Sequence, residues 1–262
     1  MISVDIEQLY TWLNAFLWPF FRILSLMITA PLLGESAIPS QVKIGFAAIV
    51  TIAIAPALGP MPEVPTGSFA GIWIAVQQVF IGLALGLVMR IVFAAVQTAG
   101  EFIGLQMGLS FASFFDPATG ANTAVLARLM NVVAMLVFLA LNGHLLMLGG
   151  FMRTFDLLPI RIGALNPNGW GVLFEWSSQV MVSGMLLALP LIIVLLTINL
   201  ALGILNRTAQ QLSVFAVGFP ISLMTGLTLL TIVLPQTTPF LSRLFDSSYS
   251  VIARLAQALA AP

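Results

Sequence analysis

The chain has 262 residues, of which 60% are hydrophobic and only 7% are charged. Soluble globular domains carry about 25% charged residues, so this composition indicates an integral membrane protein. Nine lysines and arginines balance nine acidic residues, which leaves no basic surface for nucleic acid. The chain contains no cysteine, and this excludes disulfides, thiolate metal sites and cysteine nucleophiles.

Apolar runs long enough to cross the hydrocarbon core of a bilayer occur six times along the chain. Such a crossing takes about 20 residues in a helix. The runs begin near Leu9, Val42, Phe69, Ala124, Met181 and Leu212. The sequence therefore predicts six long apolar helices.

Segments rich in proline, glycine and asparagine separate these runs, and residues of these types stop helices. They lie at 34–39, 59–67, 156–171, 206–211 and 235–239. Two less apolar segments, 97–111 and 247–261, are expected to form shorter amphipathic helices at an interface or against partners. The predicted fold is an all-α membrane protein of helical hairpins that forms one membrane domain over residues 1–262.

Several apolar runs contain a proline, which removes one backbone hydrogen bond and kinks a helix. Broken helices are typical of proteins that build a pathway, where neighbouring helices or water satisfy the freed carbonyl. Proline is also commoner in transmembrane helices in general. The prolines are Pro19, Pro31, Pro56, Pro190 and Pro220. We therefore expect kinked helices.

Three glycines, Gly100, Gly104 and Gly108, recur every four residues. On a helix this spacing places three positions without side chains along one face, which lets another helix approach closely. Glu101 lies beside this stripe and is expected either to hydrogen-bond a neighbouring subunit or to lie at a solvated interface. The stripe predicts a surface for helix packing.

An aromatic loop follows the glycine stripe. It contains Phe111, Phe114 and Phe115, and Asp116-Pro117 then starts a turn. Each phenylalanine left in water loses about 1.5 to 3 kcal/mol relative to burial. We therefore hypothesise that the loop inserts into protein or constricts a cavity, because a hydrophobic constriction can close a pore.

Arg22 lies near the middle of the first apolar run. An unpaired cation there costs about 2.5 to 3.5 kcal/mol on insertion scales. Two interpretations are open: Arg22 lines a pathway or pairs with a subunit, or it snorkels from a helix broken at Pro19. Glu35 and Glu101 are possible partners.

A polar group marks the end of the fifth run and the turn into the sixth. Its expected role is to satisfy helix-end carbonyls and amides. The group consists of Asn199, Asn206, Arg207, Gln210 and Gln211.

Enzyme signatures are missing from the sequence. There is no G-x-S-x-G, no H-E-x-x-H and no Gly-Lys pair for a P-loop, so we expect neither ATP hydrolysis nor a cofactor. An intramembrane protease would have to pair His144 with a serine such as Ser110, and no motif supports that pairing. A lone histidine does not make a metal site either, so we expect no enzyme.

Five stretches between residues 22 and 235 form a recognisable combination. They are RILSLMITAPLLGESAIPSQVK, AGEFIGLQMGLSFASFFDPATG, FLALNGHLLML, LPLIIVLLTINLALGILNR and QQLSVFAVGFP. Together these stretches resemble a known family, the R-type flagellar biosynthesis proteins (FliR) of the bacterial type III export gate.

The resemblance implies a non-enzymatic core subunit in the bacterial inner membrane, at the flagellar basal body. Such a subunit joins P-type and Q-type export proteins in a helical assembly in contact with membrane lipid, with the B-type switch protein nearby. Unfolded flagellar proteins pass through the centre of that assembly.

The resemblance also implies roles for particular residues. The loop matching 111–122 helps to plug the closed channel, which makes plug candidates of Phe111, Phe114, Phe115, Asp116 and Pro117. We expect helix packing and subunit interfaces to involve Gly100, Glu101, Gly104, Gly108, Arg22 and Arg207. One departure from the family pattern Arg-x-Ala-Pro-Gln is Gln210 in place of the proline, so this turn is expected to be less rigid.

The alternative function is a secondary transporter for a small solute, suggested by the broken helices and Arg22. Such transporters usually contain inverted repeats around a site at the membrane midplane. No repeat of fixed period is visible in the sequence.

Overall fold

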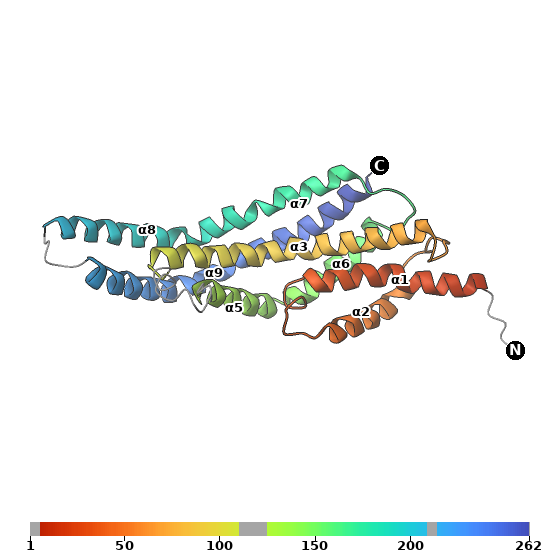
Figure 1. Cartoon of the computed structure of the whole chain (residues 1–262), viewed down its shortest axis with the longest axis horizontal. Coiled ribbons are helices and arrows are strands. Elements are labelled where there is room, and N and C mark those ends of the chain that lie inside the picture. Colours follow the sequence, from red (N-terminus) through yellow and green to blue (C-terminus); the bar gives the residue numbers. More distant parts are fainter. Residues whose placement is uncertain (1–5, 110–124, 209–213, 262) are drawn as a thin grey trace. The chain divides into compact units, whose positions relative to one another are not determined.

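A computed structural model describes residues 6–109, 125–208 and 214–261. These residues form helices and connecting turns, with no strand among them (Figure 1). The elements are α1 (Ile6–Thr29), α2 (Ser40–Ile54), the 3-10 helix η1 (Ala55–Ala57), α3 (Phe69–Gln106), α5 (Val125–Ala140), α6 (Gly143–Leu157), the 3-10 helix η2 (Pro167–Gly169), α7 (Trp170–Ser177), α8 (Gln179–Thr208) and α9 (Val214–Ala260).

The described helices confirm an all-α membrane protein. Five helical stretches are long and apolar enough to cross a membrane, and a sixth is added if the bent pair α5 and α6 counts as one span. The predicted breaks at 34–39, 59–67 and 156–171 are also confirmed, because α1, α2, α3, α6 and α7 begin or end beside them.

The two predicted shorter helices are instead parts of longer ones. The segment 97–106 continues α3, and the segment 247–260 continues α9. The predicted break at 235–239 is also wrong, since α9 runs through both Pro235 and Pro239. A proline removes one hydrogen bond from a helix, and membrane helices tolerate this loss where neighbouring groups satisfy the freed carbonyl.

The fourth apolar run, which the sequence predicts to be one continuous helix, is broken at Asn142 and Gly143. Asn142 takes a φ of 54°, in the left-handed region that asparagine enters more readily than most residues. Gly143 follows, and a Cβ there would lie 2.9 Å from the carbonyl oxygen of Phe138. Together these two residues end α5 and start α6.

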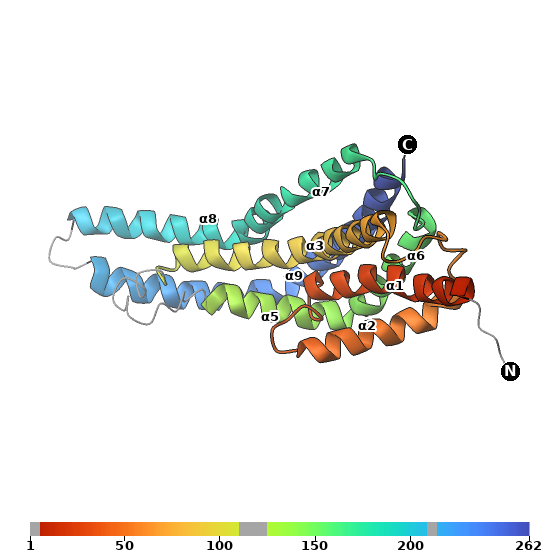
Figure 2. The same cartoon turned by 45° about the vertical axis from the view of Figure 1, so that its right-hand side comes forward.

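The chain falls into two compact units. Unit 1 comprises residues 1–91, 144–177 and 247–262, and unit 2 comprises residues 92–143 and 178–246. In unit 1, α1 packs beside α2, as both Figure 1 and Figure 2 show. The core of this unit includes the buried side chains Ile23, Leu26, Met27, Ile81 and Leu85.

Three aromatic rings form the centre of unit 2. Phe93, Phe138 and Phe245 are buried, and their ring centroids lie 5.1 to 5.7 Å apart. Aromatic pairs at such distances stabilise a core beyond the area that they bury. This cluster ties α3, α5 and α9 together within the unit.

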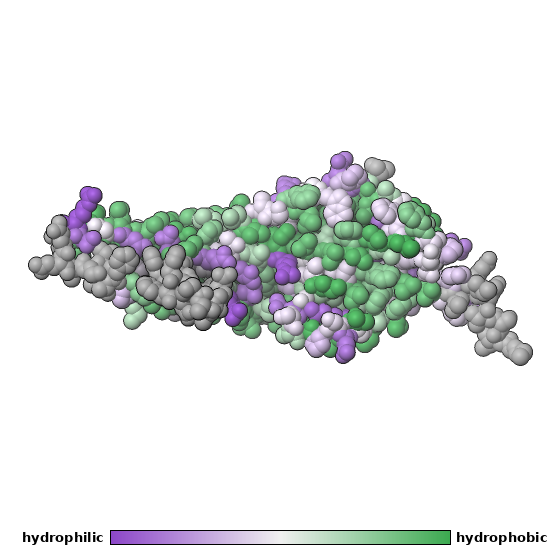
Figure 3. Space-filling view, in the orientation of Figure 1, coloured by the Kyte–Doolittle hydropathy of each residue, from purple (hydrophilic) through white to green (hydrophobic). Residues whose placement is uncertain are grey.

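Many large hydrophobic side chains of the described residues are exposed. Figure 3 shows hydrophobic residues over most of the visible face, with hydrophilic residues in scattered patches. Phe69 is 86% exposed and Ile49 is 66% exposed, for example. A surface of this kind requires lipid or partner subunits to cover it.

Candidate functional site

Arg22 lies on α1 with none of its surface exposed. Its Nε donates a hydrogen bond to Oε1 of Gln78 on α3 at 2.7 Å. Its Nη1 and Nη2 donate to the carbonyl oxygens of Thr154 at 3.2 Å and Leu158 at 3.0 Å. The guanidinium therefore joins α1 to α3 and to the end of α6, all within unit 1.

The charge of Arg22 is balanced by backbone and aromatic groups. The two carbonyls that it contacts lie at the C-terminal end of α6, where the helix dipole is negative and favours a cation. Its Cζ also lies 4.3 Å from the ring centroid of Phe155, a cation–π distance. Glu35 and Glu101 are exposed and are not among these partners.

Arg22 belongs to a buried polar face of α1. Asn14, Trp18, Arg22 and Ser25 recur at spacings of three and four residues, and each is at most 3% exposed. Side chains at this spacing share one face of a helix. Asn14 donates from Nδ2 to the carbonyl of Val64 at 2.9 Å. The buried side of α1 therefore carries a polar stripe beside the apolar core residues Ile23, Leu26 and Met27.

The backbone of α1 approaches α3 closely at two glycines, Gly82 and Gly86, that were not among the predicted site residues. A Cβ on Gly82 would collide with the Arg22 carbonyl and the Ser25 hydroxyl, and one on Gly86 would collide with Thr29. The two glycines are spaced four residues apart, as Gly100 and Gly104 are, so the same spacing rule could have found them. Gln78 carries no comparable signal in the sequence.

The glycine stripe lies at the end of α3 in unit 2. A Cβ on Gly100 would lie 2.5 Å from the Cα of Ala127, so the α5 backbone comes very close there. A Cβ on Gly104 would be 4.0 Å from the Leu126 side chain, an ordinary contact. The helix residues before the aromatic loop and those after it are thus packed together.

Gly108 has a different place from the other two glycines. It lies beyond the end of α3 with a φ of 78°. Its N–H donates to the carbonyl of Leu105 at 3.1 Å, and the N–H of Leu109 donates to that of Gly104 at 3.0 Å. This pair of bonds is a Schellman motif, which ends a helix at a left-handed residue. Gly108 therefore terminates α3 just before the aromatic loop.

Other helices of unit 2 support this end of α3. The side chain of Asn199 on α8 donates from Nδ2 to the carbonyl of Gln106, at the long distance of 3.5 Å. Ser222 on α9 donates to Oδ1 of Asn199 at 2.8 Å. A Cβ on Gly226 of α9 would lie within 3 Å of the Met107 side chain. Side chains of α8 and α9 thus contact the last turn of α3.

The plug candidates Phe111, Phe114, Phe115, Asp116 and Pro117 lie outside the described residues, and so does Gln210. Glu101 is exposed on α3, and Arg207 is exposed near the end of α8. Both belong to unit 2, whereas Arg22 belongs to unit 1. Their expected part in subunit interfaces stays a prediction.

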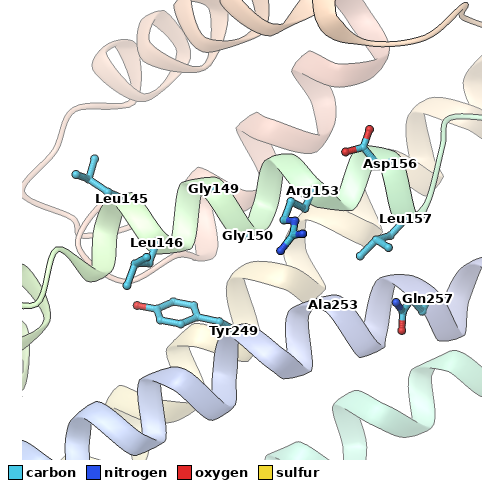
Figure 4. Close-up of a pocket in the computed structure, with 10 residues that line it drawn as sticks. All are labelled: Leu145, Leu146, Gly149, Gly150, Arg153, Asp156, Leu157, Tyr249, Ala253 and Gln257. Atoms are coloured by element: carbon cyan, nitrogen blue, oxygen red, sulfur yellow. The ribbon is translucent and has the colours of Figure 1, made fainter.

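Two clefts open on unit 1. One has a volume of about 800 Å³ and lies between α6 and the last part of α9, where the Arg153 side chain points toward α9 and Asp156 points away (Figure 4). The other has a volume of about 660 Å³ and is lined mainly by aromatic and aliphatic residues of α3 and α7, with Trp73 and Trp170 among them. Neither cleft lining contains a histidine.

Two kinds of site considered from the sequence are a metal centre and a protease pair. No group of three or more histidine, aspartate or glutamate side chains among them could hold a metal ion. His144 is half-buried at the start of α6, and its buried Nδ1 has no hydrogen-bond partner among the described residues. Ser110, its suggested partner in a protease, lies outside them.

Comparison with known proteins identifies the family. The family of bacterial export proteins, family 1, matches residues 13–248. The flagellar biosynthetic protein FliR of Escherichia coli is 49% identical over 253 residues, which cover 97% of each chain. The FliR protein of Pectobacterium carotovorum is 45% identical, over 97% of this chain and 97% of its own. The FliR protein of Bacillus subtilis is 31% identical, over 83% of this chain and 85% of its own. With helices suited to a membrane, this chain therefore belongs to the FliR family and is a membrane-embedded component of the flagellar export apparatus.

Proposed function

We propose that this chain is a core subunit of the flagellar type III protein export gate. In this proposal it assembles with P-type and Q-type subunits into a channel in the bacterial inner membrane, next to the B-type switch protein. Unfolded flagellar proteins are secreted through that channel. Residues 1–262 act as one export-gate domain, and no catalytic step is part of the proposal. Membership of the FliR family supports this function.

We further propose that the aromatic loop containing Phe111, Phe114 and Phe115 plugs the closed channel. The observation that supports this proposal is the close packing of the two helix ends on either side of the loop, the end of α3 and the start of α5. We call these helix ends the base of the loop. α3 ends in a Schellman motif at Gly108, and Gly100 lies against the backbone of α5 at Ala127. A plug has to return to one closed position, and a loop whose two ends are held together is suited to this because few conformations remain to it.

The chemistry of the loop also fits a seal. Phenylalanine rings that meet in a narrow passage exclude water, and a dry constriction blocks ions without a covalent barrier. Each ring interaction is weak enough for a passing polypeptide to displace it.

The secondary-transporter alternative receives no such support. It requires Arg22 to face a solute at an accessible site near the membrane midplane. In the described structure Arg22 is fully buried and bonded to Gln78 and to the carbonyls of Thr154 and Leu158. We therefore retain the export gate as the proposed function.

The experiment that tests the assembly is native mass spectrometry of the tagged chain, extracted in mild detergent from its own host. The proposal expects it to leave the membrane with several copies of two smaller hydrophobic export subunits. The exposed apolar surface of helices such as α2 gives the physical reason, since it needs a cover. Extraction as a single chain or as a homo-oligomer contradicts the proposed assembly.

A further inference from the structure

We propose that Arg22 delays the burial of α1 in the membrane until α3 and α6 have been synthesised. α1 contains a candidate membrane span, Tyr10–Thr29, and is made before both of its partners. In this proposal the first helix enters its final place late, although it is made first. The inference concerns how the protein is made and is independent of the proposed channel.

The partners of Arg22 lie far along the chain. Gln78 is 56 residues later, Thr154 is 132 residues later and Leu158 is 136 residues later. Synthesis runs from the N-terminus, so all three are absent when α1 leaves the ribosome. The guanidinium then has none of the acceptors that balance it in the folded protein.

The first helical hairpin offers no substitute for these partners. α2 and η1 contain no acidic residue. The side chain of Lys43 is itself a cation and donates to the carbonyls of Gly34 and Glu35. The Thr51 hydroxyl donates within its own helix, to the carbonyl of Ala47. Glu35, in the turn between α1 and α2, is exposed and is not a partner of Arg22, so the first hairpin provides none of the acceptors that hold the guanidinium in the folded protein.

One other residue on the polar face of α1, Asn14, also depends on later segments, whereas Ser25 donates within α1 to the carbonyl of Arg22. Asn14 donates to the carbonyls of Pro62 and Val64, which follow it by 48 and 50 residues. The hydroxyls of Ser25 and Thr29 find acceptors within α1 and need no later segment. The two long polar side chains of the buried face, Asn14 and Arg22, are thus the ones that wait for segments made later. A lone arginine at the middle of such a helix disfavours membrane insertion by roughly 100-fold.

The test follows one buried position while the full chain is being made. The chain has no cysteine, so Leu26→Cys, one turn after Arg22 and fully buried, gives a single reporter cysteine. The chain is translated in synchrony into inner-membrane vesicles and treated with short pulses of a water-soluble maleimide. The modified fraction is then read against the length of each nascent chain on a gel.

The reporter cysteine is expected to stay reactive until Leu158 has left the ribosome. Its reactivity then falls at least about 10-fold, which is less than the roughly 100-fold effect of a lone arginine on membrane insertion. With Arg22→Leu the reactivity falls much earlier, as soon as α1 leaves the ribosome. With Arg22→Lys it falls late, because the charge is kept. Arg153→Leu, which removes an exposed cation of α6, leaves the profile unchanged.

Equal chain lengths for protection in the Arg22 and Arg22→Leu forms overturn the proposal. So does early protection of the reporter cysteine in the Arg22→Lys form. Both results are measured as maleimide reactivity in nascent chains, before the fold is complete. They therefore do not depend on the stability of the finished Arg22→Leu protein.

Discussion

At the scale of single residues, Arg22 shows how a membrane helix can carry a charge without a carboxylate partner. Its guanidinium donates to one side-chain oxygen and two backbone carbonyls and lies over the ring of Phe155. The planar group with its several fixed donors suits this set of acceptors better than an ammonium does. The cluster joins three helices of unit 1.

Replacing Arg22 by methionine is expected to lower the free energy of unfolding by at least about 2 kcal/mol, since buried acceptors left without a donor cost about 1 to 3 kcal/mol each. Arg22→Lys is expected to be intermediate. Thermal unfolding of the purified gate complex measures the effect. Arg153→Met, at an exposed cation of the same unit, is the control and should change stability by less than about 0.5 kcal/mol. An Arg22→Met protein whose free energy of unfolding equals that of the unchanged protein contradicts the stabilising role of the Arg22 hydrogen bonds.

The glycines of unit 2 permit a second residue-scale prediction. Gly100→Ala places a methyl group 2.5 Å from the Ala127 Cα and should cost about 1 to 3 kcal/mol through overpacking. Gly203→Ala on α8 meets nothing within 4 Å and should be neutral or stabilise by up to about 1 kcal/mol. Gly104→Ala should lie between them. The same unfolding measurement tests all three, and equal effects at Gly100 and Gly203 contradict the prediction.

The sequence predicts contacts between neighbouring residues of the fold and the candidate site better than contacts between residues far apart in the chain. The cost of Arg22 follows from its place in an apolar run, but its partners do not, because two of them are backbone carbonyls more than 130 residues away. The spacing of four indicates a glycine stripe, yet it does not reveal that Gly108 lies beyond the helix with a φ of 78°. Local chemistry was predictable, and distant pairing was not.

At the scale of elements, the longest helices exceed the thickness of a bilayer. α3 has 38 residues and α9 has 47. At 1.5 Å per residue, their contour lengths are about 57 and 70 Å, against about 30 Å for a hydrocarbon core. Neither helix fits within the hydrocarbon along its whole length, so parts of each must meet water, headgroups or other protein.

The surface of α9 changes in character along its length. Its first half exposes apolar side chains such as Phe219, Met224 and Leu227, whereas its last turns expose Ser250 and Arg254. In the last turns the opposite face is buried through residues such as Val251 and Leu255. The end of α9 is therefore amphipathic, as expected from the sequence for 247–261, although it is not a separate helix.

This change gives an element-scale prediction. In membranes, a water-soluble maleimide should modify Ser250→Cys much faster than Met224→Cys, because the apolar half of α9 is expected to be covered by lipid or protein. Mass spectrometry of the intact protein gives the modified fraction. Both cysteines should react alike after denaturation, which controls for intrinsic reactivity. Equal rates in the native membrane contradict the prediction.

The elements also show where sequence patterns mislead. Pro235 and Pro239 looked like a break but lie inside α9, whereas Asn142 and Gly143 looked like part of an apolar run but end α5. A proline in a membrane helix removes one hydrogen bond, and neighbouring groups are able to satisfy the freed carbonyl. A left-handed residue changes the direction of the chain. Composition alone does not distinguish these two outcomes.

At the scale of the whole molecule, the proposed plug has to act as a barrier in the assembled gate. Changing Phe111, Phe114 and Phe115 together to serine should make cells that carry the gate leak small solutes, because a polar constriction fills with water. The leak is measured as uptake of a normally excluded sugar or dye by intact cells. It should depend on assembly and vanish when another gate subunit is deleted.

The chain offers a matched control for that experiment. Phe69, Phe80 and Phe174 are exposed phenylalanines outside the loop, and changing all three to serine removes the same number of rings. This control variant should leave the permeability barrier intact. An intact barrier in the loop variant, in cells where the gate still assembles, contradicts the plug.

The way in which Arg22 is neutralised also has a consequence for how related sequences diverge. Two of its acceptors are main-chain oxygens, which every amino acid provides, so substitutions at positions 154 and 158 leave those acceptors in place. Only the side chains of Gln78 and Phe155 can be lost by mutation. Among relatives, the residue at position 22 is therefore expected to vary together with those at 78 and 155, and independently of those at 154 and 158.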